Sequence, residues 1–100
     1  MRPIPKNKRY VSNQYLEFIR ELPCCVCGDN LVDAHHVASV GSGGSDLTCI
    51  PLCRADHTQY HVINKASFEN KHGIDVDEIR LELLELYVRQ LESLLYGREK

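Results

Sequence analysis

The sequence contains no long apolar run, and no stretch approaches the roughly 18 residues that would span a membrane. Its first ten residues, MRPIPKNKRY, lack the apolar segment that follows the charges of a secretory signal peptide. These absences argue against membrane insertion and secretion, so we expect a cytoplasmic protein in a reducing compartment. A strong net charge is also missing, because 12 basic residues face 14 acidic ones, and net charge alone indicates no nucleic-acid partner.

The cysteines do not fit a disulfide framework. A chain of 100 residues forms one domain, 1–100, with a modest core, which bound metal often supplements in small proteins. Five cysteines cannot all pair within one chain. All five, with four of the five histidines, lie between Cys24 and His61. This mixture favours bound metal over disulfides.

Helical patterns flank this segment on both sides. Ser12 is a candidate N-cap for a helix that ends near Leu22, before Pro23. Asp75 and Glu78 have the spacing of a capping box at the start of a long helix over 75–97. We expect most of its leucine stripe to be core. The surplus apolar surface predicts a second chain as a candidate partner, in a homodimer through this helix.

The central segment predicts two strands and a helix. Residues 31–37 and 48–51 have strand character, and the glycine-rich stretch 41–45 would connect them as a flexible hairpin loop. We expect Pro51 to close the second strand, because proline cannot donate to a strand ladder. A helix then opens at Cys53 and carries His57 and His61, and further helical turns run from Phe68 to Gly73.

One candidate metal site contains cysteines. Cys24 and Cys27 have the C-x-x-C spacing of a metal knuckle, and with Cys53 they offer three thiolates suited to a structural zinc ion. The fourth ligand stays open. Asp56 repeats the knuckle spacing after Cys53, although it could instead be an N-cap or first-turn acid, and Cys25 and Cys49 are the reserves.

A second candidate site contains histidines. His57 and His61 are four residues apart on one helical face, and His35 could complete three imidazoles around one metal ion. Its neighbour His36 points to the opposite face of the strand, because side chains alternate there. His36 would then be free to act as a general base. Three ligands and a separate base suit phosphodiester hydrolysis.

This arrangement resembles the HNH endonucleases, whose fold is the ββα-metal or His-Me finger core. The likeness is closest to small phage HNH proteins and the RecA-dependent recombination-enhancement nucleases. It is carried by the C-x-x-C, the Ala34-His35-His36 run, the glycine-rich loop, Ile50-Pro51-Leu52-Cys53, His57 and His61. The resemblance implies an α+β fold with a ββα-metal core over 24–65 between an N-terminal and a long C-terminal helix. It also implies metal on His35, His57 and His61, zinc on the cysteines, and His36 as base.

Two departures from the HNH pattern matter. These relatives usually have histidine where this sequence has Asp56, a harder ligand for zinc. The middle asparagine of the motif, which orients the hairpin or the base, is missing. By spacing from Cys53 its place is taken by Thr48, although Asp46 is chemically nearer.

The leading interpretation is a DNA endonuclease of phage or prophage recombination, with recombination proteins as candidate partners. Three imidazoles suit Zn²⁺, Ni²⁺ or Mn²⁺, whereas the relatives often use Mg²⁺. The alternative is a catalytically silent zinc module that binds nucleic acid or protein. A cysteine redox protein is poorly supported, because no βαβ pattern surrounds the C-x-x-C. The basic arm over 1–10, with Arg2, Lys6, Lys8 and Arg9, would strengthen DNA binding, or else be a solubilising tail.

Overall fold

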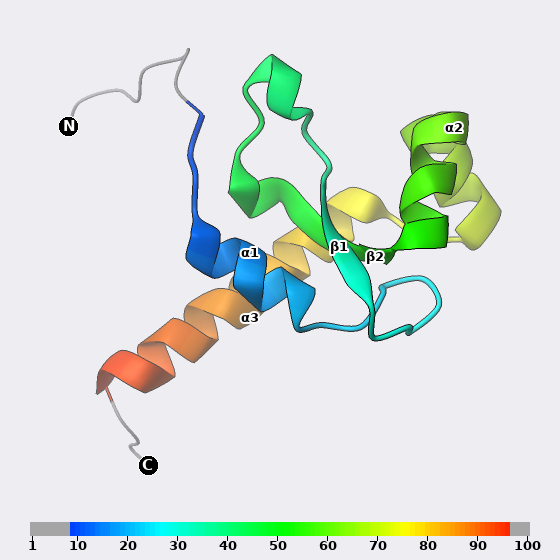
Figure 1. Cartoon of the computed structure of the whole chain (residues 1–100). Helices are drawn as coiled ribbons and strands as arrows, with labels where there is room; N and C mark the ends of the chain where they lie inside the picture. The colour runs from blue at the N-terminus through cyan, green and yellow to red at the C-terminus, as the bar shows by residue number, and fades with distance from the viewer. Residues whose placement is uncertain (1–8, 97–100) are drawn as a thin grey trace.

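The computed structural model describes residues 9–96, which fold as three α-helices around a two-stranded antiparallel sheet (Figure 1). The elements follow in the order α1 (Asn13–Arg20), β1 (Val32–His36), β2 (Cys49–Cys53), α2 (Arg54–His72) and α3 (Val76–Tyr96), with two 3-10 turns, η1 (Val40–Ser42) and η2 (Asp46–Thr48), between the strands. The predicted α+β class with flanking helices is therefore confirmed. Arg2, Lys6 and Lys8 of the basic arm lie outside the described residues. No helix between residues 9 and 96 has the length and apolar character to cross a membrane.

Helix α1 begins where its capping residue predicts. The Ser12 hydroxyl accepts a hydrogen bond from the Tyr15 backbone N–H at 3.1 Å, which satisfies one of the free donors at the helix start. Tyr15 and Ile19, one turn apart, are fully buried against the sheet side of the helix. The helix is thus held by its cap and by one apolar face.

The two strands form a hairpin in which His35 pairs with Ile50 and His36 with Cys49. The prediction that Pro51 closes the second strand was wrong, since β2 continues to Cys53. The carbonyl of Pro51 accepts the Cys25 N–H at 3.0 Å, so this residue faces the edge of β2 that does not pair with β1. The missing N–H of proline therefore costs no ladder hydrogen bond.

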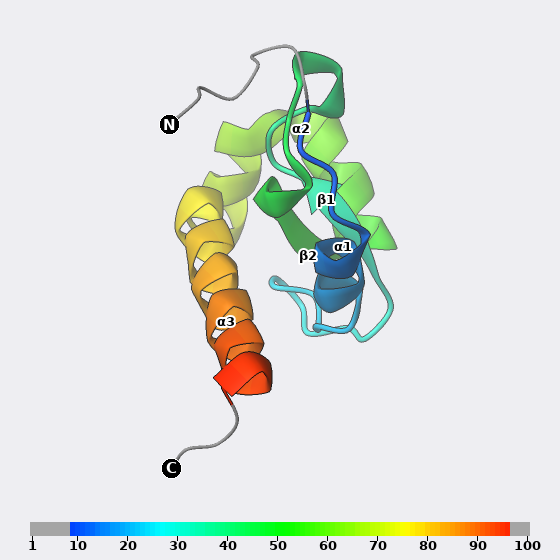
Figure 2. The same cartoon turned by 90° about the vertical axis from the view of Figure 1, so that its left-hand side faces the viewer.

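Strand β2 lies at the centre of the fold, and all five of its residues are buried. Figure 2 shows α3 on one side of the hairpin and α1 on the other. One core cluster joins β2 to α2 and the start of α3 through Leu52, Phe68 and Val76. The other joins Cys49 to Tyr15 and Ile19 of α1. Both clusters meet along α3, so this helix ties the two halves together.

Helix α2 contains the two predicted helical segments, joined by a break at Asn64. This residue has a φ of 72°, in the left-handed region, and its side-chain carbonyl accepts the Ser67 N–H at 3.1 Å. Asparagine tolerates this conformation better than most residues. The helix ends at Gly73, which has a φ of 65°, as predicted.

Helix α3 is capped by Asp75, whose carboxylate accepts the Glu78 N–H at 3.1 Å. The expectation that most of its leucine stripe is core was wrong. Its first half packs on the domain, but the residues of α3 that pack on the two core clusters end at Tyr87, and the second half leaves the core. The exposed apolar residues of α3 are Leu81, Leu86, Val88, Leu91, Leu94, Leu95 and Tyr96. A second chain at this surface stays a prediction.

The connection between the strands requires a glycine at one position. A Cβ on Gly44 would lie 1.9 Å from the backbone oxygen of Ala38, and backbone atoms cannot move aside cheaply. We expect Gly44→Ala to lower the free energy of unfolding by about 1–3 kcal/mol, as overpacking does. Gly41→Ala is the matched control, because its Cβ would meet only the Ser39 hydroxyl at 3.6 Å. Equal urea midpoints for the two variants would contradict this account of the loop.

Candidate metal centres

The first candidate centre brings together Cys24, Cys27, Cys53 and Asp56. One ligand atom from each lies within 4.8 Å of all the others. A carboxylate oxygen of Asp56 is 3.3 Å from the Cys24 sulfur and 3.2 Å from the Cys53 sulfur, and the sulfurs of Cys27 and Cys53 are 3.7 Å apart. These four side chains could hold a metal ion with a complete ligand set.

Local backbone geometry places these ligands. Cys24 and Cys27 lie in a tight turn that closes with a hydrogen bond from the Gly28 N–H to the Cys24 carbonyl, where Gly28 has a φ of 81°. Cys53 is the N-cap of α2, and its sulfur accepts the Asp56 N–H at 3.4 Å. The Cys24 sulfur likewise accepts the Val26 N–H at 3.5 Å. Backbone N–H groups thus point at two of the sulfurs.

The acidic groups in this cluster crowd one another. A backbone N–H lowers the pKa of Cys53, but burial and contacts with Asp56 and Cys27 outweigh it and raise the pKa to about 12. Burial works to raise the pKa of Asp56, yet hydrogen bonds from the thiols of Cys53 and Cys24 lower it overall. Without a cation, the thiol of Cys53 therefore keeps its proton and shares it in a hydrogen bond with the Asp56 carboxylate. A bound cation would replace that proton, as metal binding to thiols requires.

The other two cysteines lie outside the cluster. Burial raises the pKa of Cys25 and of Cys49 to about 12 each, so both stay neutral thiols. Cys49 is fully buried beside Tyr15 and Ile19, in the other core cluster. The sequence left the fourth ligand open, and the structure places Asp56 there and neither reserve cysteine.

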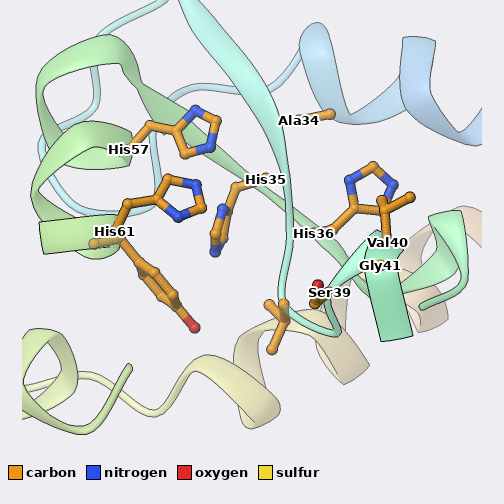
Figure 3. Close-up of a pocket in the computed structure, with 10 residues that line it drawn as sticks. Ala34, His35, His36, Ser39, Val40, Gly41, His57 and His61 are labelled. Carbon is orange, nitrogen blue, oxygen red and sulfur yellow. The ribbon is translucent and has the colours of Figure 1, made fainter. Parts of the chain in front are cut away.

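The second candidate centre contains His35, His57 and His61, which converge in Figure 3. His35 comes from β1, and the other two lie one turn apart on α2. The ring centroids are 4.9 Å apart for His35 and His57, 5.2 Å for His35 and His61, and 4.9 Å for His57 and His61. Three potential ligand nitrogens lie within 4.8 Å of one another, as the sequence predicted.

The buried nitrogen of His35 is the observation that most favours a metal ion at this cluster. His35 is 3% exposed, and its Nε2 atom has no hydrogen-bond partner among residues 9–96. An unpaired buried polar atom is costly unless something else binds it. Burial, reinforced by His57 and His61, lowers the pKa of His35 to about 4. The ring is therefore neutral at neutral pH, the form that binds metal.

Asp33 orients one of these histidines. Its carboxylate accepts a hydrogen bond from Nδ1 of His57 at 3.0 Å, and this bond lowers the pKa of Asp33. With the proton on Nδ1, Nε2 of His57 is free to bind a metal, as carboxylate partners of ligand histidines commonly ensure. Sequence reasoning missed Asp33. A signal was present, because residues two apart on a strand share a face, and Asp33 lies two before His35.

His36 lies on the other side of β1 from this cluster, as predicted (Figure 3). Its Nε2 atom is 2.8 Å from a carboxylate oxygen of Asp46. Thr48 instead stabilises the hairpin, since its hydroxyl accepts the Ala38 N–H at 3.3 Å and its carbonyl accepts the Val37 N–H. Of the two residues weighed for the missing asparagine, Thr48 thus contacts the hairpin and Asp46 contacts His36.

The three clustered histidines and His36 line one cavity of about 460 Å³. Another wall is formed by Ser39, Val40 and Gly41 of the hairpin loop. His61 is exposed, which keeps the histidine cluster open to solvent. A metal ion there would keep positions for water or substrate, with an imidazole nearby.

Comparisons with known proteins give a family. The family model described as "Protein of unknown function (DUF968)" matches residues 1–88. A protein of Escherichia coli (strain K12), "Uncharacterized protein YdfU", is 35% identical over 81 residues, which make up 76% of this chain and 23% of that protein. This chain therefore spans about a quarter of the length of that relative. No solved structure is significantly similar to the chain.

The cysteine cluster predicts which thiols hold metal. Cys53→Ala should lose the metal ion and lower the free energy of unfolding by on the order of several kcal/mol, because metal binding contributes to folding. Cys25→Ala is the matched control and should keep the metal, since Cys25 is outside the cluster. Elemental analysis and thermal melting report both effects. Equal metal content and melting temperature in the two variants would show that the cluster holds none.

Proposed function

The chain belongs to the DUF968 family, and we propose that it is a metal-dependent DNA endonuclease of the HNH type. The observation that carries the proposal is the buried Nε2 of His35, which has no hydrogen-bond partner in the described part of the chain and lies beside His57 and His61, with His36 across the strand on the same cavity. A module that only binds would have no use for a base at that place. The strand–loop–strand–helix order of β1, β2 and α2 supports the proposal, because the HNH resemblance implies this order.

We assign the two centres different tasks. Three thiolates and a carboxylate form a closed set of four, which suits a structural Zn²⁺ ion. Three imidazoles that open on a cavity suit a catalytic divalent ion, with Zn²⁺, Ni²⁺, Mn²⁺ and Mg²⁺ as the candidates. When bound there, the metal ion would offset negative charge on the scissile phosphate and on the leaving oxygen.

The chain supplies a base in a defined tautomer. Burial works to raise the pKa of Asp46, but hydrogen bonds from His36, Ser12 and Arg9 lower it to about 2, so its carboxylate is ionised. It therefore accepts the Nε2–H of His36, and the lone pair of the neutral ring lies on Nδ1. In the proposed reaction Nδ1 takes a proton from water. The water oxygen forms a bond to phosphorus, and the bond from phosphorus to the leaving sugar oxygen breaks.

Other side chains hold this geometry. Asp33 fixes the ring of His57, and Asp46 fixes that of His36. Both carboxylates act through histidines and are positioning residues. The substrate is DNA and the setting phage or prophage recombination, on the strength of the HNH resemblance. The exposed surface of α3 is a candidate contact for a second chain or a recombination protein.

Substitutions of His35 and of His36 should impair cleavage in different ways. His36→Ala should keep the fold, both metal ions and DNA affinity, yet slow cleavage by roughly 10²–10⁴-fold, as the loss of a general base does. His35→Ala should lose one metal ion together with cleavage. The assay is nicking of supercoiled plasmid at saturating divalent metal, with metal content measured on the same samples.

His72→Ala is the control for histidine replacement on this domain. His72 lies at the end of α2 with its Nε2 2.7 Å from the Gln59 side chain, outside the cavity. This variant should nick at the parent rate. A His36→Ala protein that also nicks at the parent rate would remove the mechanism.

A further inference from the structure

Arg9 is part of the basic arm in the sequence, but its side chain turns into the domain. Its Nη1 lies 2.5 Å from the same Asp46 oxygen that His36 contacts at 2.8 Å. The other Asp46 oxygen accepts the Ser12 N–H at 2.8 Å. Three donors therefore surround one carboxylate, which is 1% exposed.

Further contacts hold Arg9 in place. Its guanidinium also donates to the Gly44 carbonyl at 3.3 Å, and its side chain is only 28% exposed. One residue on, the Tyr10 carbonyl accepts the Asp46 N–H at 3.0 Å. Residues 9–12 thus contact both the side chain and the backbone of Asp46, and so hold the loop before β2. A side chain engaged in this way is poorly placed to bind DNA phosphates as the rest of the arm was expected to do.

The physical need for Arg9 comes from the burial of Asp46. A buried carboxylate is stable only when it is paired and hydrogen-bonded. Among residues 9–96, Arg9 is the permanently charged side chain that contacts it, because the charge of His36 depends on protonation. Without Arg9 the Asp46 carboxylate would be more stable if it turned toward water. It would then lose its fixed place beside the His36 imidazole.

We propose that Arg9 is a positioning residue of the active site, which holds the Asp46 carboxylate against the Nε2–H of His36. The proposal rests on the proposed function, because it assigns Arg9 to the general base. The base is oriented by a segment N-terminal to the hairpin, through a carboxylate 37 residues further along the chain.

Arg9→Gln tests this with Arg89→Gln as the matched control. Arg89 is also paired with an acid, Glu85 at 2.7 Å, but that pair lies on the exposed surface of α3. For plasmid nicking, Arg9→Gln should lower kcat by roughly 10- to 100-fold, the scale of a misplaced catalytic group, with KM and its salt dependence unchanged. Arg9→Lys should recover part of the loss, because it restores the charge. Arg89→Gln should match the parent.

A double-mutant cycle separates the pairing from a DNA contact. If Arg9 acts through Asp46, Asp46→Asn should cost less in an Arg9→Gln background than in the parent, because the unpaired carboxylate is then gone. If Arg9 binds a phosphate, the two losses in kcat/KM should multiply. The KM of Arg9→Gln should then rise and the salt slope fall by about one, which would overturn the proposal.

One readout needs no cleavage. Long-range ¹H–¹⁵N NMR of the His36 ring should show the proton on Nε2 in the parent and in Arg89→Gln, and a changed tautomer mixture in Arg9→Gln. An unchanged His36 spectrum in a folded Arg9→Gln protein would overturn the role of Arg9. A parent that cleaves no DNA but shows this spectral change would instead refute the nuclease and keep the Arg9–Asp46–His36 arrangement.

Discussion

The structure depends on the junction between β2 and the first turns of α2. Cys53 ends the strand and caps the helix, Asp56 lies in the first turn, and His57 and His61 follow on the same helix. The two candidate metal centres therefore share one short segment of backbone. A cation at the cysteine cluster would relieve the crowding of three sulfurs and a carboxylate, and would fix this segment against the turn that carries Cys24. Such a constraint would help to hold the helical histidines in place relative to His35.

The hairpin adds the second half of the arrangement. Alternation along β1 sends His35 toward α2 and His36 toward the loop that carries Asp46. A carboxylate lies on each side of the strand. Asp33 contacts His57, which clusters with His35, and Asp46 contacts His36. Asp33 on β1 and Asp46 in η2 thus each favour one tautomer of the histidine that they contact. The division of tasks that we propose for His35 and His36 is what would best distinguish a catalytic domain from one that uses metal only for stability.

Local patterns predicted much of this. The cap at Ser12, both strands, the ends of the helices and the paired halves of both candidate ligand sets follow from periods of two and 3.6 residues and from turn chemistry, all of which act over a few residues. The contacts that local spacing could not give join distant positions: His57 with Asp33 across 24 residues, and Arg9 with Asp46 across 37. The error at Pro51 has the same origin, because the free edge of β2 is defined only once the sheet exists. The extent of the core along α3 also depends on how far the other elements reach.

The most direct test of the central claim is nicking of supercoiled plasmid by the purified chain, with Mg²⁺, Mn²⁺, Ni²⁺ or Zn²⁺ supplied in turn and the metal content of the protein measured alongside. The account predicts two metal ions per chain under the active condition, nicked product with at least one of these ions, and none after chelation. A protein that carries metal on both centres and leaves the plasmid intact with all four ions would contradict it, and would favour a zinc module without catalysis.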